Sequence, residues 1–254
     1  MGIRSTTAPV LNWSKGEPMQ TVSDTYKNIL ADYRHVKEHK AIIGGVEYDS
    51  SALFDIQVSG TLFSGSGPCI GAVVSRELDL SVIPQSTIPK MAEIKLETRL
   101  VIKDDLTGEV LQASEWIPKG TFYIDTRETD KVTGVMTIHG YDAMLKAEQM
   151  LLTETTEDDW PKPMDEVVEE IAKRMGVKVD SRTVISHTMM VGYPLEYTMR
   201  EVLGYIAAAH CGNWIITDAG ELRLITLNCI PPETFYLVDE DGYAITFGGV
   251  RIIV

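Results

Sequence analysis

The chain has 254 residues, of which 44% are hydrophobic and 24% are charged, and its mean hydropathy of −0.02 is ordinary for a water-soluble globular protein. These values argue against collagen-like, disordered and membrane-spanning classes, since no run approaches the roughly 20 apolar residues of a membrane helix. The formal net charge of −14 argues against a protein that grips DNA or anionic lipid through Lys and Arg.

The cysteines and the N-terminus give no sign of a secreted protein. Cys69, Cys211 and Cys229 are odd in number, widely spaced and without a CxxC pair, which argues against a disulfide framework and a zinc knuckle. We expect all three to be buried as small hydrophobic residues in a reducing compartment. The opening sequence MGIRSTTAPVLNW lacks the apolar stretch of a secretory signal.

The first 40 residues are expected to form an arm and a helix. Residues 1–20 mix Ser, Thr, Pro and Gly without periodicity, which predicts an extended arm. Residues 22–40 carry apolar side chains at helical spacing after a possible capping residue, Ser23 or Asp24, and therefore predict a helix.

Residues 41–140 are rich in short strand-forming segments. The clearest alternates apolar and charged side chains from Glu93 to Ile102, which predicts a strand with one face buried and one face in water. Further strands are predicted at 41–47, 53–62, 71–82, 110–116, 120–126 and 135–140. Strands at this spacing are typical of an antiparallel barrel or sandwich.

Residues 141–226 are predicted to be rich in helix. Asp142 can cap a short helix over Ala143–Met150. A longer helix is predicted over 164–175, where apolar residues form one stripe, and Gly176 is expected to end it.

A third helix and a hairpin are predicted at the end of this region. Thr198 and Glu201 have the spacing of a capping box, in which each side chain satisfies a free backbone N–H group at the helix start. The helix is expected to stop at Gly212. Strands at 213–217 and 221–226 then flank an Asp-Ala-Gly turn.

Residues 227–254 return to strand character. Strands are predicted at 235–238, 243–247 and 250–254. Because the sequence stops on RIIV, without a polar cap or turn, we expect it to be a piece of a longer chain.

The histidines do not have the spacing of a recognised site. His35 and His39 lie four residues apart, as zinc ligands on one helix face do, but the Glu of an HExxH motif is missing and the surrounding mixed charges favour a solvated face. His139 and His210 are interpreted as structural residues. His187 has no neighbouring Cys or Asp in the sequence to orient it for catalysis.

The glycine-rich and acidic segments are also explained by loops and turns. Ser64-Gly65-Ser66-Gly67 fits neither a nucleophile elbow nor a phosphate-binding loop. Hairpin turns account for Asp104-Asp105, Glu157-Asp158-Asp159 and Asp239-Glu240-Asp241-Gly242, the last of which lacks the final Glu of a calcium loop. We therefore predict no catalytic, cofactor-binding or metal-binding residues, and no enzyme.

Five segments, taken in order, resemble one family. They are IPKMAEIKLETRLVI (88–102), SEWIPKGTFYIDTRETD (114–130), TGVMTIHGYDAMLKAEQ (133–149), EEIAKRMGVKVD (169–180) and TMREVLGYIAAAHCGNWIITDAGELRLI (198–225). Over roughly residues 40–254 the chain resembles the baseplate-hub or tail-tip proteins of phages and prophages of Gram-positive bacteria. In that family such segments belong to the N-terminal structural region of tail-associated proteins, some of which carry a C-terminal peptidase or lysozyme domain.

The resemblance implies an α+β fold that is mainly β. Residues 1–40 would be the N-terminal arm and helix, and 41–140 an antiparallel, barrel-like hub domain. Residues 141–226 would form a helix-rich module with a terminal hairpin, and 227–254 the start of a second β-barrel domain.

The implied role is that of a virion structural protein. Family members form a threefold ring that connects the tail tube to the distal tip or spike, so a homotrimer is expected, with the distal tail protein, the tip or spike and possibly the tape-measure protein as partners. Assembly would take place in the bacterial cytoplasm. DNA would pass the ring without specific binding, and neither a cofactor nor membrane insertion is expected.

Two other function classes remain open from the residues. One is a cell-wall hydrolase. The other is a carbohydrate- or receptor-binding module of the tail tip, in which exposed aromatic side chains such as Trp116 or Trp160 would stack on sugars.

Overall fold

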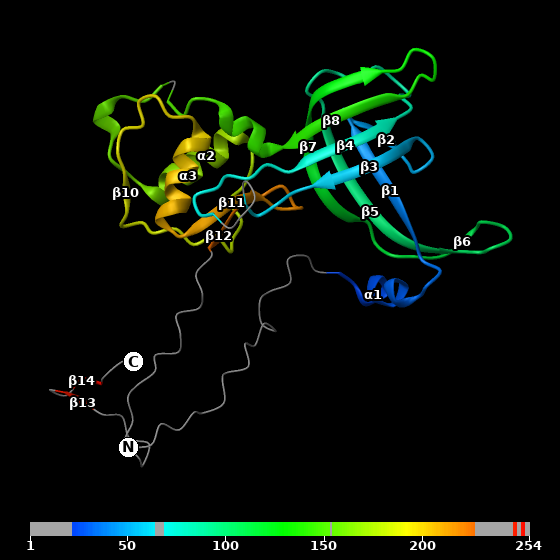
Figure 1. The fold of residues 1–254 in the computed structure, drawn as a ribbon, viewed down its shortest axis with the longest axis horizontal. Helices are drawn as coiled ribbons and strands as arrows, with labels where there is room; N and C mark the ends of the chain where they lie inside the picture. Colours follow the sequence, from blue (N-terminus) through cyan, green and yellow to red (C-terminus); the bar gives the residue numbers. More distant parts are fainter. Residues whose placement is uncertain (1–21, 64–68, 153, 227–245, 248–249, 252–254) are drawn as a thin grey trace. The chain divides into compact units, whose positions relative to one another are not determined.

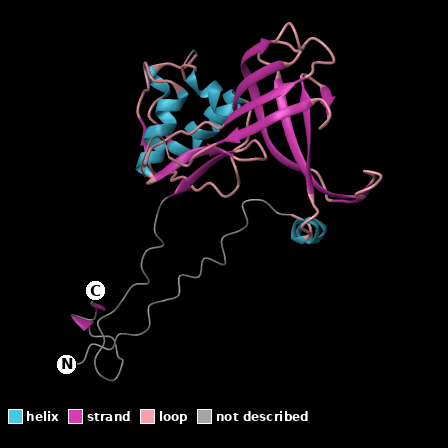
Figure 2. Cartoon of the chain, turned by 45° about the vertical axis from the view of Figure 1, so that its right-hand side comes forward, coloured by secondary structure: helices cyan, strands magenta, loops and turns pink. Residues whose placement is uncertain are grey.

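A computed structural model describes residues 22–63, 69–152, 154–226, 246–247 and 250–251 (Figure 1). Val22–Leu227 form one compact unit, in which a curled antiparallel sheet is joined to a smaller helix-rich module (Figures 1 and 2). The fold is α+β and mainly β, which confirms the predicted class.

The large sheet has eight strands, with the order β2-β1-β5-β7-β8-β4-β3 and with β6 as a third partner of β5, beside β1 and β7. Every pairing in it is antiparallel. The strands are β1 (Val36–Ile43), β2 (Val46–Tyr48), β3 (Leu53–Ser59), β4 (Glu77–Val82), β5 (Glu93–Lys103), β6 (Val110–Ala113), β7 (Ile117–Thr129) and β8 (Met136–Asp142).

The alternation in β5 explains how the sheet acquires its core. Ile94 and Leu96 are buried on one face, whereas the alternating residues Glu93 and Lys95 are exposed. The same face of neighbouring strands contributes Phe122 and other apolar side chains to one cluster inside the curl. This alternation fixes the register of β5, because a shift of one residue would bury the charged side chains.

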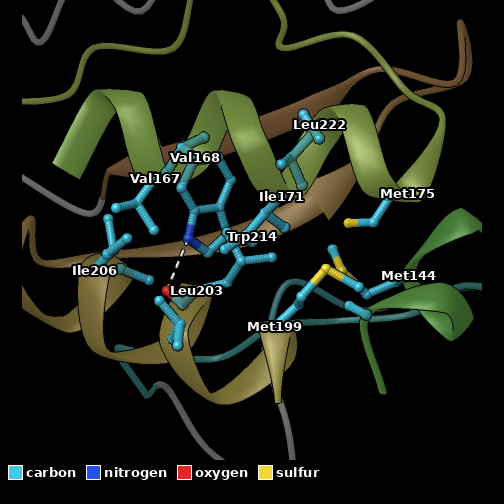
Figure 3. Close-up of a cluster of buried hydrophobic side chains, with 14 of the residues drawn as sticks. Met144, Val167, Val168, Ile171, Met175, Met199, Leu203, Ile206, Trp214 and Leu222 are labelled. Atoms are coloured by element: carbon cyan, nitrogen blue, oxygen red, sulfur yellow. Dashed lines mark hydrogen bonds between the residues drawn. The ribbon is translucent and has the colours of Figure 1, made fainter. Parts of the chain in front are cut away.

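The helix-rich module surrounds a second core. Its elements are η2 (Ala143–Glu148), η3 (Glu157–Asp159), β9 (Lys162–Pro163), α2 (Met164–Met175), β10 (Met190–Val191), α3 (Met199–Ala209), β11 (Gly212–Ile216) and β12 (Leu222–Thr226). Figure 3 shows Trp214 between the two α-helices, and its indole Nε1–H donates to the carbonyl oxygen of Leu203 at 2.9 Å. The largest side chain of this core therefore has its only polar atom satisfied.

Several local predictions are confirmed. The apolar stripe forms α2, which ends at Gly176 with φ of 72°. The capping box opens α3, and Asp142 caps η2, which is a 3-10 helix. The predicted hairpin is β11–β12.

The expected helix over 22–40 is wrong in its second half. Helix α1 spans only Asp24–Ala31 after the Ser23 cap, and β1 begins at Val36. The reason is tertiary: all eight residues of β1 pair with β5, from Val36 opposite Val101 to Ile43 opposite Ile94. Backbone pairing along the whole length of β1 outweighs the weak helical periodicity of residues 36–40.

The expected strand over 71–82 is divided between two sheets. Only β4 (Glu77–Val82) pairs within the large sheet, and the preceding residues pair with β11 instead. Near the C-terminus, β13 (Thr246–Phe247) and β14 (Val250–Arg251) form an antiparallel hairpin outside the compact unit. The strand predicted at 235–238 lies outside the described residues, as do the arm at 1–20 and the loop at 64–67.

The position of Ile206 in α3 generates a first prediction. Its side chain is 1% exposed in the module core, so Ile206→Asp buries a charge and should lower the free energy of unfolding by about 3–5 kcal/mol. The neighbouring Tyr205 is 61% exposed, and Tyr205→Asp is the matched control. Urea denaturation should separate the two variants, and equal stability would show that the buried face of α3 is assigned incorrectly.

A second prediction concerns the pH dependence of stability. Hydrogen bonds from the Arg182 side chain, opposed by burial, hold the pKa of Asp180 at about 2, below its usual 3.8. A lowered carboxyl pKa stabilises the fold above the unfolded-state pKa, and this contribution is lost as pH falls from about 4 to 2. Asp180→Asn should therefore cost about 2 kcal/mol at pH 7 and almost nothing at pH 2.

The control for Asp180 is Asp125→Asn, which changes an exposed carboxylate on β7. Urea denaturation of the three proteins between pH 7 and pH 2 measures the difference directly. A stability difference between wild type and Asp180→Asn that stays constant over this range would contradict the assigned pKa.

Candidate functional site

The segment 69–76, called the strap below, joins the large sheet to the helix-rich module. Its backbone pairs with β11: the Gly71 amide donates to Gly212 O at 2.9 Å, the Trp214 amide to Ala72 O at 2.8 Å and the Val74 amide to Trp214 O at 2.9 Å. The strap thus adds a third strand beside β11 before the chain continues into β4. The two parts of the compact unit are therefore joined by backbone pairing as well as by side-chain packing.

The side chain of Asn213 holds the strap in place through three hydrogen bonds. Its buried side chain accepts a hydrogen bond from the Ala72 amide at 2.9 Å and donates to the carbonyl oxygens of Leu62 and Cys69, at 2.9 and 2.8 Å. These bonds satisfy three backbone groups of the connection between β3 and β4. An amide is the suitable side chain here because it offers an acceptor and two donors without charge.

Asp142 occupies the other end of the strap, where β8 meets η2. Its fully buried carboxylate accepts hydrogen bonds from the amides of Arg76 and Met144, at 2.9 and 3.0 Å, and from the Ser75 hydroxyl at 3.1 Å. Burial raises the pKa of Asp142, while these donors and the charge of Arg76 oppose the rise. One carboxylate thereby fixes the strap and the start of the module.

Arg76 extends this contact to the β11–β12 hairpin. Its guanidinium forms an ion pair with Asp218 in the hairpin turn and lies 5.5 Å above the ring centre of Phe122. A Cβ atom at Gly120 would lie 2.5 Å from Arg76 Nη2 and 2.9 Å from Phe122 Cε2, and the φ of 135° is one that other residues rarely adopt, so glycine suits this position. We call Asp142, Arg76, Asn213 and Asp218, together with the strap, the junction.

The junction was not predicted as a unit from the sequence. Asp142 was identified only as a cap, and Asn213 and Asp218 only as part of a hairpin. Asn213 and its partner Ala72 are 141 residues apart, which no local pattern reveals.

Removal of the Asn213 side chain tests the junction. Asn213→Ala leaves one buried amide and two carbonyl groups without their partner, and should lower the free energy of unfolding by about 2–4 kcal/mol. Asn28→Ala, on the exposed side of α1, is the control and should change stability by less than about 0.5 kcal/mol. Chemical denaturation measures both, and an unchanged midpoint for Asn213→Ala would contradict the assignment.

The structure separates His35 and His39, whose spacing in the sequence is that of one helix face. His35 lies after α1, with Nδ1 2.6 Å from Asp32 O, and His39 lies on β1. His139 on β8 is 2.7 Å from Asp79 Oδ1. His210 ends α3, where Nδ1 is 2.9 Å from Ile206 O and Nε2 accepts from the Ser186 amide, which is a structural role.

His187 has a carboxylate partner in space, although none lies beside it in the sequence. Its Nδ1 is 2.9 Å from Oδ2 of Asp165, which lies in the first turn of α2, 22 residues earlier. Burial raises the pKa of Asp165, but the hydrogen bond from His187, the backbone amides at the start of α2 and the charge of His187 together outweigh it, so the pKa is lowered. The adjacent Ser186 hydroxyl contacts Thr188 Oγ1 at 2.9 Å.

Two of the three acidic segments serve local backbone geometry. Asp104 accepts from the Leu106 and Thr107 amides in the β5–β6 turn, as expected. Asp159 accepts from the Thr156 amide and caps η3, which is not a hairpin turn. Asp239-Glu240-Asp241-Gly242 lie outside the described residues. In the described part of the chain, no group of three or more His, Cys, Asp or Glu could hold a metal ion.

The cysteines are less buried than expected. Cys69 is half-buried, and Cys211 is exposed at the end of α3 with a φ of 50°. Backbone geometry explains Cys211, since the chain reverses there between α3 and β11 and turns the side chain outward. Cys229 lies outside the described residues.

The two tryptophans considered for sugar stacking already have partners. Lys40 and Arg99 lie over the ring of Trp116, at 4.8 and 4.5 Å from its centre. Lys162 lies 4.9 Å from the ring centre of Trp160, which also packs edge-on against Tyr193. Cations of the same chain thus compete with any sugar for these rings.

Apolar side chains are exposed on the surface of the helix-rich module around α3. A groove of about 340 Å³ lies between the loop after β10 and the outer side of α3. Tyr197 and Tyr205 line it with ring centres 5.5 Å apart, and Met190 beside them is 47% exposed. Exposed aromatic and Met side chains that adjoin in this way are typical of protein–protein contact surfaces. No helix in the described residues is long and apolar enough to cross a membrane.

Comparison with known proteins finds partly similar solved structures, two of which are tail proteins. No family model and no curated protein matches the chain. The 43 kDa tail protein of prophage MuSo2 from Shewanella oneidensis is 14% identical, with a TM-score of 0.48 over 76% of this chain and 56% of that chain. The tail protein from Neisseria meningitidis MC58 is 11% identical, with a TM-score of 0.49 over 82% and 54%, respectively. The chain spans about half the length of each.

Proposed function

We propose that the chain is a structural subunit of the tail of a phage or phage-like particle, at the baseplate hub or tail tip. The proposal rests on the position in the fold of the five segments that resemble the baseplate-hub or tail-tip family. The segment with GTFYID contributes Gly120, which lies against Arg76 of the junction, and the segment with GYDAMLKAE contributes Asp142. The helix–Gly–Asn–hairpin unit contributes Asn213 and Asp218. Three of the five segments thus supply residues that unite the sheet and the module.

Such a rigid union suits a ring subunit. A protein that connects a tail tube to a tip or spike must hold its contact surfaces in fixed positions, and the junction fixes the module against the sheet. The large sheet is open, and every residue of its outer strand β6 is exposed. Unpaired strand edges and the Tyr197–Tyr205 groove are available for neighbouring subunits. We propose a homotrimer with closed symmetry.

The acidic composition is compatible with a position on the path of DNA. Each chain carries a formal charge of −14, and a ring of three multiplies it. Carboxylates on a channel wall repel phosphate, so DNA passes without adhering. The proposed partners are the distal tail protein, the tip or spike proteins and the tape-measure protein, and the proposed location is the virion tail after assembly in the bacterial cytoplasm.

Native mass spectrometry of the chain at micromolar concentration tests the assembly. The expected result is a trimer that survives dilution to about 1 μM, because ring contacts of a structural hub bury a large surface. A monomer alone at every concentration would count against the ring. A second experiment incubates the protein with peptidoglycan. Release of soluble fragments would favour the alternative function, a cell-wall hydrolase.

A further inference from the structure

The open end of the curled sheet contains a pocket of about 390 Å³, called the lumen pocket below. It lies where the concave face of the sheet meets the junction. Lys37 and His39 come from β1, Lys119 from β7, Arg76 from the strap and Asp218 from the β11–β12 hairpin. Elements distant in sequence thus bring their side chains to one cavity.

The lumen pocket is locally basic in an acidic protein. Three basic side chains, Lys37, Arg76 and Lys119, face it together with a single carboxylate, that of Asp218, whereas the whole chain carries 23 basic and 37 acidic residues. Asp218 is already engaged by Arg76. A concave site between low-dielectric walls strengthens the field of such charges and attracts anions.

Polar atoms in the wall have unused hydrogen-bonding capacity. Among the described residues, neither Nε nor Nη2 of Arg76 has a hydrogen-bond acceptor, although Nε is 3.9 Å from Asp142 Oδ2. His39 Nδ1 is likewise buried without a partner. Burial and then the charge of Lys37 lower the pKa of His39, so the imidazole is neutral at pH 7 and available as a hydrogen-bonding group.

One wall of the pocket is apolar. Leu96 on β5 and Val58 and Ile56 on β3 line it, together with the ring of Tyr26 from α1. The mouths of β-barrels commonly hold ligands that combine an apolar body with a few polar anchors. Here the anchors are cationic, so the matching ligand has an anionic head and an apolar body.

We propose that the lumen pocket binds a small amphiphilic anion, with a carboxylate head near Lys37, Arg76 and Lys119. Its apolar body lies against Val58 and Leu96. A medium-chain carboxylate such as octanoate has this chemistry and a volume that the pocket can hold. The proposal stands on the charges and walls of the pocket and is independent of the assembly role.

Isothermal titration calorimetry with three probes tests whether binding needs both the anionic head and the apolar body of the ligand. Octanoate should bind with one-to-one stoichiometry. Octyltrimethylammonium, which has the same tail and the opposite charge, should bind at least tenfold more weakly than octanoate. Inorganic phosphate, which lacks the tail, should also bind at least tenfold more weakly than octanoate. Equal affinity for octanoate and the ammonium compound, or for octanoate and phosphate, would overturn the proposal.

Two variants locate the site. Lys37→Gln combined with Lys119→Gln removes two cations outside the junction and should weaken octanoate binding at least tenfold, whereas Lys131→Gln in the exposed β7–β8 turn should not. Tyr205→Ala alters the apolar groove on α3 and should leave affinity unchanged. Loss of binding in Tyr205→Ala, or unchanged binding in the double Lys variant, would show that octanoate does not occupy the lumen pocket. The melting temperature of each variant checks that it is folded.

Discussion

The buried carboxylate of Asp142 is the constraint on which the rest of the arrangement depends. A charge without contact to water is tolerated only when donors surround it, and here they are the amides of Arg76 and Met144 and the hydroxyl of Ser75. To supply these donors the strap must run beside the start of η2. That course places it next to β11, where Asn213 satisfies its remaining backbone groups.

The same constraint shapes the surfaces. Because Arg76 lies between Asp142 and Asp218, it holds the β11–β12 hairpin against the open end of the sheet and forms one wall of the lumen pocket. The module core around Trp214 then fixes α3, whose outer side carries Tyr205 and the apolar groove. A single polar contact thus sets the relative positions of the two surfaces proposed to bind other molecules.

Features with local causes could be predicted from the sequence, and features with distant causes could not. The capping box at Thr198 and the stop at Gly176 depend on neighbours within four residues, and both are confirmed. The strap is held by Asn213, which is 141 residues away from Ala72, so the sequence predicted one continuous strand over 71–82. The end of α1 depends on the pairing of β1 with β5, so the predicted helix was too long. Asp165 and His187 also meet only through the fold.

Hydrogen exchange of the strap amides, measured by mass spectrometry, tests most directly the claim that sheet and module form one body. The amides of Gly71 and Val74 donate across the junction, and that of Ala72 donates to Asn213. If the junction opens only when the protein unfolds, these amides should exchange as slowly as those of β5 in the sheet core. Exchange at the rate of the exposed β7–β8 turn would mean that the sheet and the module separate freely, which contradicts the account.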